Sequence, residues 1–346
     1  MGLDLETLLI TAFHSGASDL HLVTGAPPTL RVAGRLTRLN YPALEEANVH
    51  EALELLQEKC KEERRLRNVA ECRDMNCDIP GVCRLRVHVF WETGRPAITI
   101  RFIPERVPLP EELGLPDTLM TMCQRPGILL VTGPTGSGKS TTLAALVRWA
   151  LETKGLRVVT IEDPCEYRFS HFRGIVSQKQ VGLDCESFHR GVIEALREDP
   201  DVIVLGELRD PESADAALLA SETGHLVLAT MHTPTAARTL DRFVDLFPAG
   251  RQEFTKNSLS RALNGVFAQR LLPRANGEGR VLAYELLVAT PAVRNLIRKG
   301  EYQQVVSVIQ AGKQLGMITM ADYVKGLVQR GVVAPEQAIS EVEEFE

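Results

Sequence analysis

Hydrophobic and polar residues alternate in two neighbouring segments, residues 83–90 and residues 97–102, and this alternation predicts two β-strands. In the first segment apolar side chains alternate with basic ones, so one face would be buried and the other polar. Thr93 and Gly94 suit a two-residue turn between the strands. We therefore expect an antiparallel hairpin.

That turn would place Arg86 directly opposite Arg101 and His88 opposite Thr99, with Arg84 on the same face. Two like charges directly opposite one another destabilise a sheet by a few tenths to about 1 kcal/mol. An anion bound on this face would relieve the repulsion. Alternatively, the arginine side chains spread into water on a solvated face, and the pattern does not decide between the two.

The remaining N-terminal elements complete a small α+β domain, residues 1–103. Four prolines then fall between residues 104 and 117, where neither a sheet nor a helix can continue for long. We interpret this proline-rich segment as the linker to a second domain. Within the first domain, the pattern predicts helices at residues 4–14 and 45–67, a strand at 18–23, and a hairpin of residues 29–32 and 35–39.

The second domain, residues 118–290, contains short apolar runs separated by helix-forming segments. This order is typical of a parallel β-sheet, whose ligands bind beyond the carboxyl ends of the strands. Residues 291–346 would form a C-terminal helical region. The strands are expected at residues 128–132, 157–161, 201–207, 225–232, 266–272 and 280–288.

The sequence GPTGSGKS at residues 133–140 follows the first of these strands and precedes a helix-like segment. This order is typical of a P-loop, in which backbone N–H groups and a helix N-terminus bind phosphate. Lys139 would contact the β- and γ-phosphates of ATP, and the Ser140 hydroxyl would coordinate Mg²⁺. The expected nucleotide-binding residues are Gly133, Pro134, Thr135, Gly136, Ser137, Gly138, Lys139, Ser140 and Thr141.

Acidic residues follow two other strands of the same sheet. Glu207 stands where a Walker B carboxylate belongs and would reach Mg²⁺ directly or through water, unless it is an ordinary exposed carboxylate. Hydrolysis also needs a group that orients or deprotonates water. Glu162, Asp163 and Glu166 are candidates, and spacing does not decide which of them does this, caps a helix or supports the metal.

Two histidines flank the predicted strand at residues 225–232. His232 follows its carboxyl end and is a candidate to report the γ-phosphate as a switch. His225, at the other end, would orient a carboxylate. For a single histidine at a strand end, a structural role with satisfied hydrogen bonds is the common alternative.

Composition limits the classes of function. The chain has 346 residues, of which 44% are hydrophobic and 24% charged, as in a globular protein of two domains. A net charge of -6 and an aromatic content of 5% argue against a dedicated nucleic-acid-binding protein. No apolar run is long enough to span a bilayer, so we expect no transmembrane segment and a cytoplasmic protein, at most peripheral to a membrane.

The seven cysteines are odd in number and contain no CxxC pair. A disulfide framework is therefore not expected, and the thiols should be reduced. Cys60, Cys72, Cys77 and Cys83 could gather around zinc, but their spacings fit no common zinc motif, and their role stays open.

Four sequence boxes resemble those of the type IV pilus and type II secretion ATPases, where they are called Walker A, Asp box, Walker B and His box. Residues 18–36 also resemble the start of the PAS-like N-terminal domain of that family. The resemblance implies a RecA-like P-loop NTPase domain preceded by a PAS-like α+β domain. The boxes are GPTGSGKSTTLA at 133–144, TIEDPCEY at 160–167, ALREDPDVIVLGELRD at 195–210 and ETGHLVLATMHT at 222–233.

Within that family the chain most resembles the pilus retraction ATPases, the PilT family of twitching motility proteins. We expect neither the long additional N-terminal domain nor the tetracysteine zinc module of the extension and secretion ATPases. Residues 291–299 are similar to the AIRNLIRE segment of retraction ATPases, with Val293 in place of isoleucine and Lys299 in place of the last glutamate. Gln180 stands where the family usually has an acidic residue.

The resemblance also implies roles for individual residues and an assembly. The assembly is a hexameric ring at the inner membrane, with a pilus platform protein as partner and no nucleic acid. Glu166 would act as general base and Glu207 would handle Mg²⁺. The implied set also includes Glu162 and Asp163 of the Asp box, His225 and His232 of the His box, and Arg84, Arg86 and Arg101, which would reach a phosphate across a subunit boundary.

We therefore expect a Mg²⁺-dependent ATPase motor that drives pilus retraction, with domain rotation about the proline-rich linker. Within the family, the alternatives are an accessory retraction ATPase and an extension or secretion ATPase. Two alternatives come from other classes. A RecA-like nucleic-acid translocase would be stimulated by DNA, and a nucleotide-gated binding module would change shape without appreciable turnover.

Overall fold

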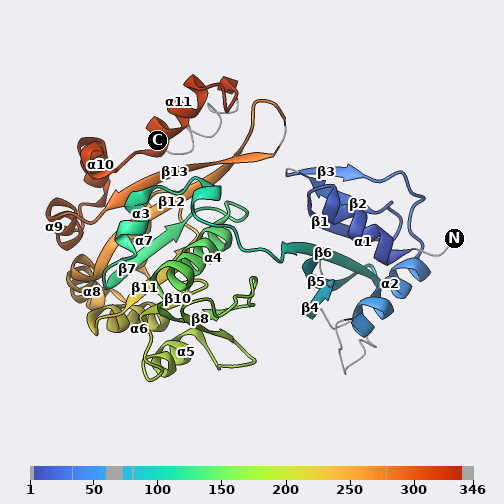
Figure 1. Ribbon diagram of the computed structural model, residues 1–346, viewed down its shortest axis with the longest axis horizontal. Helices are drawn as coiled ribbons and strands as arrows, with labels where there is room; N and C mark the ends of the chain where they lie inside the picture. Colours follow the sequence, from blue (N-terminus) through green and yellow to red (C-terminus); the bar gives the residue numbers. More distant parts are fainter. Residues whose placement is uncertain (1–3, 33, 60–72, 80–81, 278, 337–346) are drawn as a thin grey trace. The chain divides into compact units, whose positions relative to one another are not determined.

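The structure is a computed structural model that describes residues 4–32, 34–59, 73–79, 82–277 and 279–336. The chain divides into two compact units, Met1–Arg106 and Val107–Glu346. Each unit is built on one sheet, of six strands in the first and seven in the second (Figure 1). The linker bounds 104–117 and the other domain bounds stay predictions.

The N-terminal unit contains an antiparallel sheet with the strand order β3-β2-β1-β6-β5-β4. The apolar face of this sheet and the helices α1 and α2 enclose one hydrophobic core. The structure describes the second helix as far as Lys59, and the rest of the helix expected up to residue 67 lies outside the described residues. The elements are α1 (Leu5–His14), β1 (Ala17–Val23), β2 (Thr29–Val32), β3 (Arg35–Arg38), α2 (Glu46–Lys59), β4 (Arg73–Ile79), β5 (Cys83–Glu92) and β6 (Arg95–Pro104).

The β5–β6 hairpin has the register that the alternating pattern predicted. Arg86 pairs with Arg101 and His88 with Thr99. The turn residue Thr93 has a φ of 49°, as a two-residue turn between twisted strands requires. Leu85, Val87 and Val89 are each 0% exposed, so the alternating apolar side chains do form the buried face. The register prediction is confirmed.

Aspartates from neighbouring strands compensate the basic face of this sheet. The Nε atom of Arg101 donates to Oδ1 of Asp19 at 2.9 Å, and Asp19 on β1 is only 5% exposed. The other two pairs are longer and join β5 to β4: Arg86 to Asp74 at 3.9 Å and Arg84 to Asp78 at 3.8 Å. Aspartate carboxylates within the sheet therefore offset the repulsion between the arginines.

The C-terminal unit contains a sheet with the order β13-β12-β7-β11-β10-β8-β9. All neighbouring strands are parallel except β13, which runs antiparallel to β12. The strands are fully buried in the middle of the sheet, as expected when helices cover both faces. They are β7 (Gly127–Thr132), β8 (Arg157–Glu162), β9 (Ile175–Gln180), β10 (Val202–Leu205), β11 (Leu226–Met231), β12 (Leu263–Pro273) and β13 (Arg280–Val288).

Helices follow most of these strands, and the last three α-helices form the predicted C-terminal helical region (Figure 1). The α-helices are α3 (Asp117–Met122), α4 (Lys139–Trp149), α5 (Phe188–Ala195), α6 (Pro211–Glu222), α7 (Ala236–Asp245), α8 (Ala249–Ala262), α9 (Pro291–Lys299), α10 (Val305–Ala311) and α11 (Met320–Gln329). Short 3₁₀ turns lie at Glu111–Leu113, Tyr302–Gln304 and Lys313–Leu315, and a π turn at Ala150–Lys154.

The sequence pattern missed two strands, β4 and β9, which are both edge strands of their sheets. An edge strand has one neighbour and a polar outer side, so its hydrophobic signal is weak. The sequence of β9, IVSQKQ, contains only two apolar residues. Pairing with β8 makes this segment a strand, and local composition does not.

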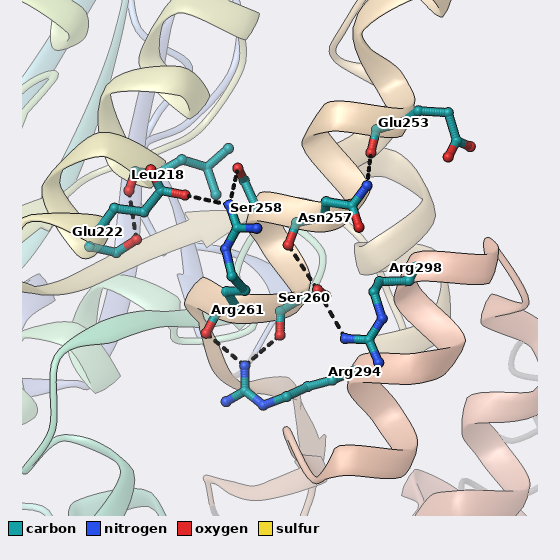
Figure 2. A network of polar contacts seen from close by, with 10 residues as sticks. Leu218, Glu222, Glu253, Asn257, Ser258, Ser260, Arg261, Arg294 and Arg298 are labelled. Carbon is teal, nitrogen blue, oxygen red and sulfur yellow. Dashed lines mark hydrogen bonds and ion pairs between the residues drawn. The ribbon is translucent and has the colours of Figure 1, made fainter.

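Arg294 of α9 caps the carboxyl end of α8 (Figure 2). Its Nη1 atom donates to the carbonyl oxygens of Ser260 (2.5 Å) and Arg261 (2.6 Å), and its Nη2 atom donates to that of Leu263 (3.0 Å). The last carbonyls of a helix have no partner inside it, and a cation there is favourable. The AIRNLIRE-like segment is thus attached to the ATPase unit through its first arginine.

Cys77 differs from the expectation for the cysteines. It is disulfide-bonded, so the expectation of reduced thiols is wrong for this residue. Cys83, Cys123, Cys165 and Cys185 are free. Among the described residues no group of three or more His, Cys, Asp or Glu side chains is placed to hold a metal ion.

Within the described ranges no helix combines the length and the hydrophobicity that a bilayer span requires.

Asp19 gives a test of the N-terminal sheet. Asp19→Ala leaves Arg101 without its buried partner, and we expect the free energy of unfolding to fall by about 1–3 kcal/mol. Asp74→Ala is the matched control, because Asp74 is half exposed and its pairs with Arg86 and His88 should each contribute less than about 1 kcal/mol. Urea titration followed by Trp91 fluorescence, in a Trp149→Phe background, measures both. Equal losses would contradict the assignment of Asp19.

Candidate active site

The P-loop lies between β7 and α4, as the sequence predicted. Gly133 has a φ of 143°, and a Cβ atom there would lie 2.3 Å from the carbonyl oxygen of Gln269 and 2.7 Å from Oγ of Ser137. Only glycine fits this position. Gly138, with a φ of 91°, is the N-cap of α4. Gln269 of β12 supports the loop, since its Nε2 atom donates to the carbonyl oxygen of Ser137 at 2.7 Å.

Lys139 points back into this loop. Its Nζ atom donates to the carbonyl oxygens of Gly133 at 2.8 Å and Pro134 at 3.0 Å. Burial lowers the pKa of Lys139, and the charges of Glu207 and Glu166 oppose that effect. The loop therefore holds a cation beside the N-terminus of α4, which is the arrangement that binds a phosphate.

His232 connects Lys139 to Glu207. Its Nδ1 atom lies 3.5 Å from Nζ of Lys139, and its Nε2 atom lies 3.0 Å from Oε1 of Glu207. The imidazole of His232 therefore lies between the cation of the loop and the carboxylate of Glu207.

Glu207 follows β10 and has two partners. Arg209 contributes its Nη2 atom at 2.6 Å from Oε2, and His232 contacts the other oxygen. Burial acts to raise the pKa of Glu207, but the hydrogen bonds and charges of Arg209 and His232 outweigh burial, so the pKa is lowered. The carboxylate is therefore ionised, as a metal ligand must be.

The three acidic residues of the Asp box differ in their surroundings. Glu162 accepts a hydrogen bond from Oγ1 of Thr160 at 2.7 Å, and burial raises its pKa. The side chain of Gln178 and the backbone of Glu166 also hydrogen bond to Glu162, so this carboxylate supports the Asp box from within. Asp163 is exposed and its charge acts on Arg209, whereas the charge of Glu166 acts on Lys139. Of the three, Glu166 is the one whose charge reaches the loop lysine.

Two glutamines of β9 hold the Asp box in place, and the sequence analysis gave them no role. Gln178 accepts from the N–H of Phe169 at 3.0 Å and donates to the carbonyl oxygen of Tyr167 at 2.8 Å. Gln180 accepts from the N–H of Cys165 at 3.3 Å. An acidic side chain could accept the same bond, so the departure at residue 180 keeps the contact and removes a charge.

Tyr167 connects this loop to the P-loop helix, because its hydroxyl lies 3.0 Å from Oγ1 of Thr141. The nucleotide contact expected of Thr141 stays a prediction, and the contact that the structure gives it is with the Asp box. Ser140, the expected Mg²⁺ ligand, is exposed in the first turn of α4, and Thr135 and Gly136 are exposed on the loop. The sequence does not indicate the contact between Tyr167 and Thr141, because it depends on the order of the strands in the sheet.

His225 does not lie at this site. It precedes β11, whereas His232 follows it, and a strand of this length separates the two by about 20 Å. Nδ1 of His225 lies 3.1 Å from Oγ1 of Thr223 and 3.0 Å from the carbonyl oxygen of Ala220. The expectation that His225 orients a carboxylate at the nucleotide is therefore corrected: this histidine lies at the amino edge, where it lines a cavity of about 410 Å³.

The structure thus brings together the P-loop, Lys139, Glu166, Glu207 and His232 at the carboxyl edge of the sheet. It places Arg84, Arg86 and Arg101 on the sheet of the other unit. Their action on a phosphate stays a prediction.

Comparison with known proteins agrees with this arrangement. A family model described as "Type II/IV secretion system protein" matches residues 3–341. The chain is 42% identical over 338 residues to the type IV pilus retraction ATPase PilT of Pseudomonas aeruginosa, covering 97% of each protein. It is 43% identical over 313 residues to a twitching motility protein of Neisseria gonorrhoeae, covering 90% of this chain and 83% of that one.

A solved structure is also similar to this chain. The crystal structure of the pilus retraction motor PilT with bound ADP matches with a TM-score of 0.81 and 41% identity, covering 98% of this chain and 97% of that one. Fold and site together define a P-loop ATPase, with a RecA-like domain after a PAS-like α+β domain. The chain belongs to the type II/IV secretion system protein family, and it is similar to the pilus retraction ATPases over nearly its whole length.

Gly133 tests the phosphate cradle. Gly133→Ala forces the loop away from Gln269, and we expect ATP affinity to fall by at least about 100-fold, or about 2.7 kcal/mol. Gly136→Ala is the matched control, because its φ of 79° is also positive but no atom lies within 4 Å of the added carbon. In Gly136→Ala the backbone strain alone should weaken ATP binding, by about 1–2 kcal/mol. Titration with a fluorescent ATP analogue measures both, and wild-type affinity in Gly133→Ala would contradict the cradle.

Proposed function

We propose that this protein is a Mg²⁺-dependent ATPase motor that powers type IV pilus retraction. The observation that carries the proposal is the contact series from Lys139 through His232 to Glu207, which joins the phosphate cradle to the Walker B carboxylate. The likeness to retraction ATPases over 97% of the chain supports the choice of process.

The residues of the site fit ATP and Mg²⁺. Mg²⁺ prefers oxygen ligands and is usually held by one or two carboxylates together with substrate phosphates. Ser140 and Glu207 supply a hydroxyl and an ionised carboxylate beside the loop, and no larger protein cage is required. When bound, the ion neutralises developing charge on the phosphates.

Glu166 is the general base of the proposed reaction. Its charge acts on Lys139, which supports a role beside the γ-phosphate, whereas Glu162 is hydrogen bonded within the Asp box by Thr160 and Gln178. A carboxylate at this place would orient the attacking water and accept its proton. Asp163 would act indirectly, through Arg209, on the ionisation of Glu207.

His232 would report the presence of the γ-phosphate. A phosphate in the loop attracts the Lys139 ammonium more strongly than the imidazole of His232 and the two carbonyl oxygens do. Lys139 would then turn from His232 toward the phosphate, and His232 would be free to follow the nucleotide. Binding and loss of the γ-phosphate thereby become a movement of the segment after β11.

The proposed assembly is a hexameric ring at the cytoplasmic face of the inner membrane, with a pilus platform protein as partner. In such a ring Arg84, Arg86 and Arg101 would act on the nucleotide of a neighbouring subunit. Each of these arginines would then exchange its aspartate partner for phosphate oxygens, to which guanidinium groups bind well. The proline-rich linker would absorb the rotation between domains.

Glu166 separates chemistry from binding. Glu166→Gln keeps the shape of the side chain and removes the base, so we expect turnover to fall by at least about 100-fold while ATP affinity stays within about threefold. Lys139→Ala is the contrasting variant, in which affinity itself is lost. Steady-state hydrolysis and nucleotide titration measure the two effects. Wild-type turnover in Glu166→Gln would remove Glu166 from the proposed mechanism.

The biological role is tested by deleting the gene for this protein in the organism that encodes it. We expect accumulation of surface pili and loss of twitching, with both restored by wild type and neither by Lys139→Ala. Loss of surface pili would indicate an extension ATPase, and a partial defect would indicate an accessory retraction ATPase. Hydrolysis that is stimulated by single-stranded DNA would instead favour a nucleic-acid translocase.

A further inference from the structure

Glu285 on β13 is a buried carboxylate outside the nucleotide site. It is only 5% exposed, and its Oε1 atom accepts from the backbone N–H of Ala236 at 2.8 Å. The backbone N–H of Met320 also hydrogen bonds to this carboxylate. Ala236 is the first residue of α7 and Met320 the first residue of α11. One side chain therefore serves the N-termini of two helices.

Both helices already have a capping side chain of their own. Thr235 accepts from the N–H of Arg238 at 3.2 Å, and Thr319 accepts from the N–H of Asp322 at 3.1 Å. Each threonine satisfies one of the four N–H groups that a helix leaves without an internal partner. Glu285 satisfies a further one in each helix, and both helix dipoles favour its negative charge. The sheet itself does not require a carboxylate at this position.

The start of α7 is connected to the nucleotide site. His232 lies three residues before the N-cap Thr235, in the short segment between β11 and α7. Oγ1 of Thr239 lies 2.7 Å from Oγ1 of Thr233 and 3.4 Å from Oγ1 of Thr132, the last residue of β7. Movement of the first turn of α7 would therefore move the segment that carries His232.

The start of α11 is connected to β13. Ile318 pairs with Leu286 of β13. The N–H of Leu286 donates to the carbonyl oxygen of Ile318 at 2.9 Å. The rings of Tyr284 and Tyr323 lie 4.1 Å apart between centroids, so α11 packs against β13 (Figure 1). Glu285 thus stands between the C-terminal region and the segment that contacts the nucleotide.

We propose that Glu285 is a positioning residue that couples α11 to His232. With both N–H groups bound, the carboxylate holds the first turn of α7, and with it His232, in the place from which His232 contacts Lys139 and Glu207. When α11 leaves β13, the carboxylate keeps only one of its two helix partners and the His232 segment loosens. The inference rests on the proposed role of His232 in ATP turnover.

Met320 provides the test in the full chain. Met320→Pro removes the N–H that Glu285 binds, and proline is well tolerated at the first position of a helix. The preceding Thr319 is extended, with a ψ of 154°, as a residue before proline must be. Met320→Ala is the matched control, because it also removes the buried side chain but keeps the N–H.

We expect Met320→Pro to lower kcat by about tenfold relative to Met320→Ala, with KM within about threefold because the P-loop is untouched. Amide hydrogen exchange in residues 232–239 should be about tenfold faster in the proline variant than in the alanine variant. Exchange in β7 should be the same in both. Glu285→Gln has only one acceptor oxygen in place of two, so its kcat and its exchange rates should match those of the proline variant. It replaces the proline variant in the test if that variant does not fold.

Equal kcat and equal exchange at residues 232–239 in the two Met320 variants would overturn the coupling. Faster exchange throughout the ATPase unit, β7 included, would also overturn it, because it would show a general loss of stability. Failure of the proposed function is distinguishable from both outcomes. In that case the wild-type protein itself would not hydrolyse ATP, or His232→Ala would turn over at the wild-type rate.

Discussion

The ATPase unit depends on the hydrogen bonds between the P-loop carbonyl oxygens and the buried ammonium group of Lys139. Lys139 lies among carbonyl oxygens of its own loop, beside a helix N-terminus, and its positive charge is desolvated. Such a site is poised for a polyanion, because a phosphate supplies the charge that carbonyl dipoles supply only in part. Gln269 donates to the backbone of the loop and His232 contacts the lysine, and both contacts help to hold the loop and its cation in position.

Three buried or half-buried carboxylates join elements elsewhere in the molecule, and each of the three meets a cation or helix N-termini. Asp19 binds Arg101 in the N-terminal sheet, Glu207 binds Arg209 beside the P-loop, and Glu285 binds the first turns of α7 and α11. A carboxylate without such a partner would take up a proton or destabilise the fold. These pairs therefore join elements that hydrophobic packing alone would leave free to slide.

The same contacts give the proposed motor a route from chemistry to movement. Charge that arrives at Lys139 would change the partners of His232, and the segment after β11 leads directly into α7. Through Glu285, the start of α7 shares its partner with α11, and Arg294 fastens α9 to the end of α8. A nucleotide-dependent change at the sheet edge would thus reach the C-terminal helices through a contiguous series of hydrogen bonds to backbone groups.

What the sequence by itself determined were features set by short spacings: the P-loop, the buried strands that lead to it, and the β5–β6 register with Arg86 opposite Arg101. Glycine positions and a period of two are local properties, so they can be recognised without the fold. Only the tertiary structure decided which strands are neighbours. That order brings Gln178 to the Asp box, Asp19 to Arg101 and Glu285 to two helices, and it leaves His225 one strand length away from His232. No local pattern encodes these contacts, because each joins segments whose proximity depends on how the whole sheet is assembled.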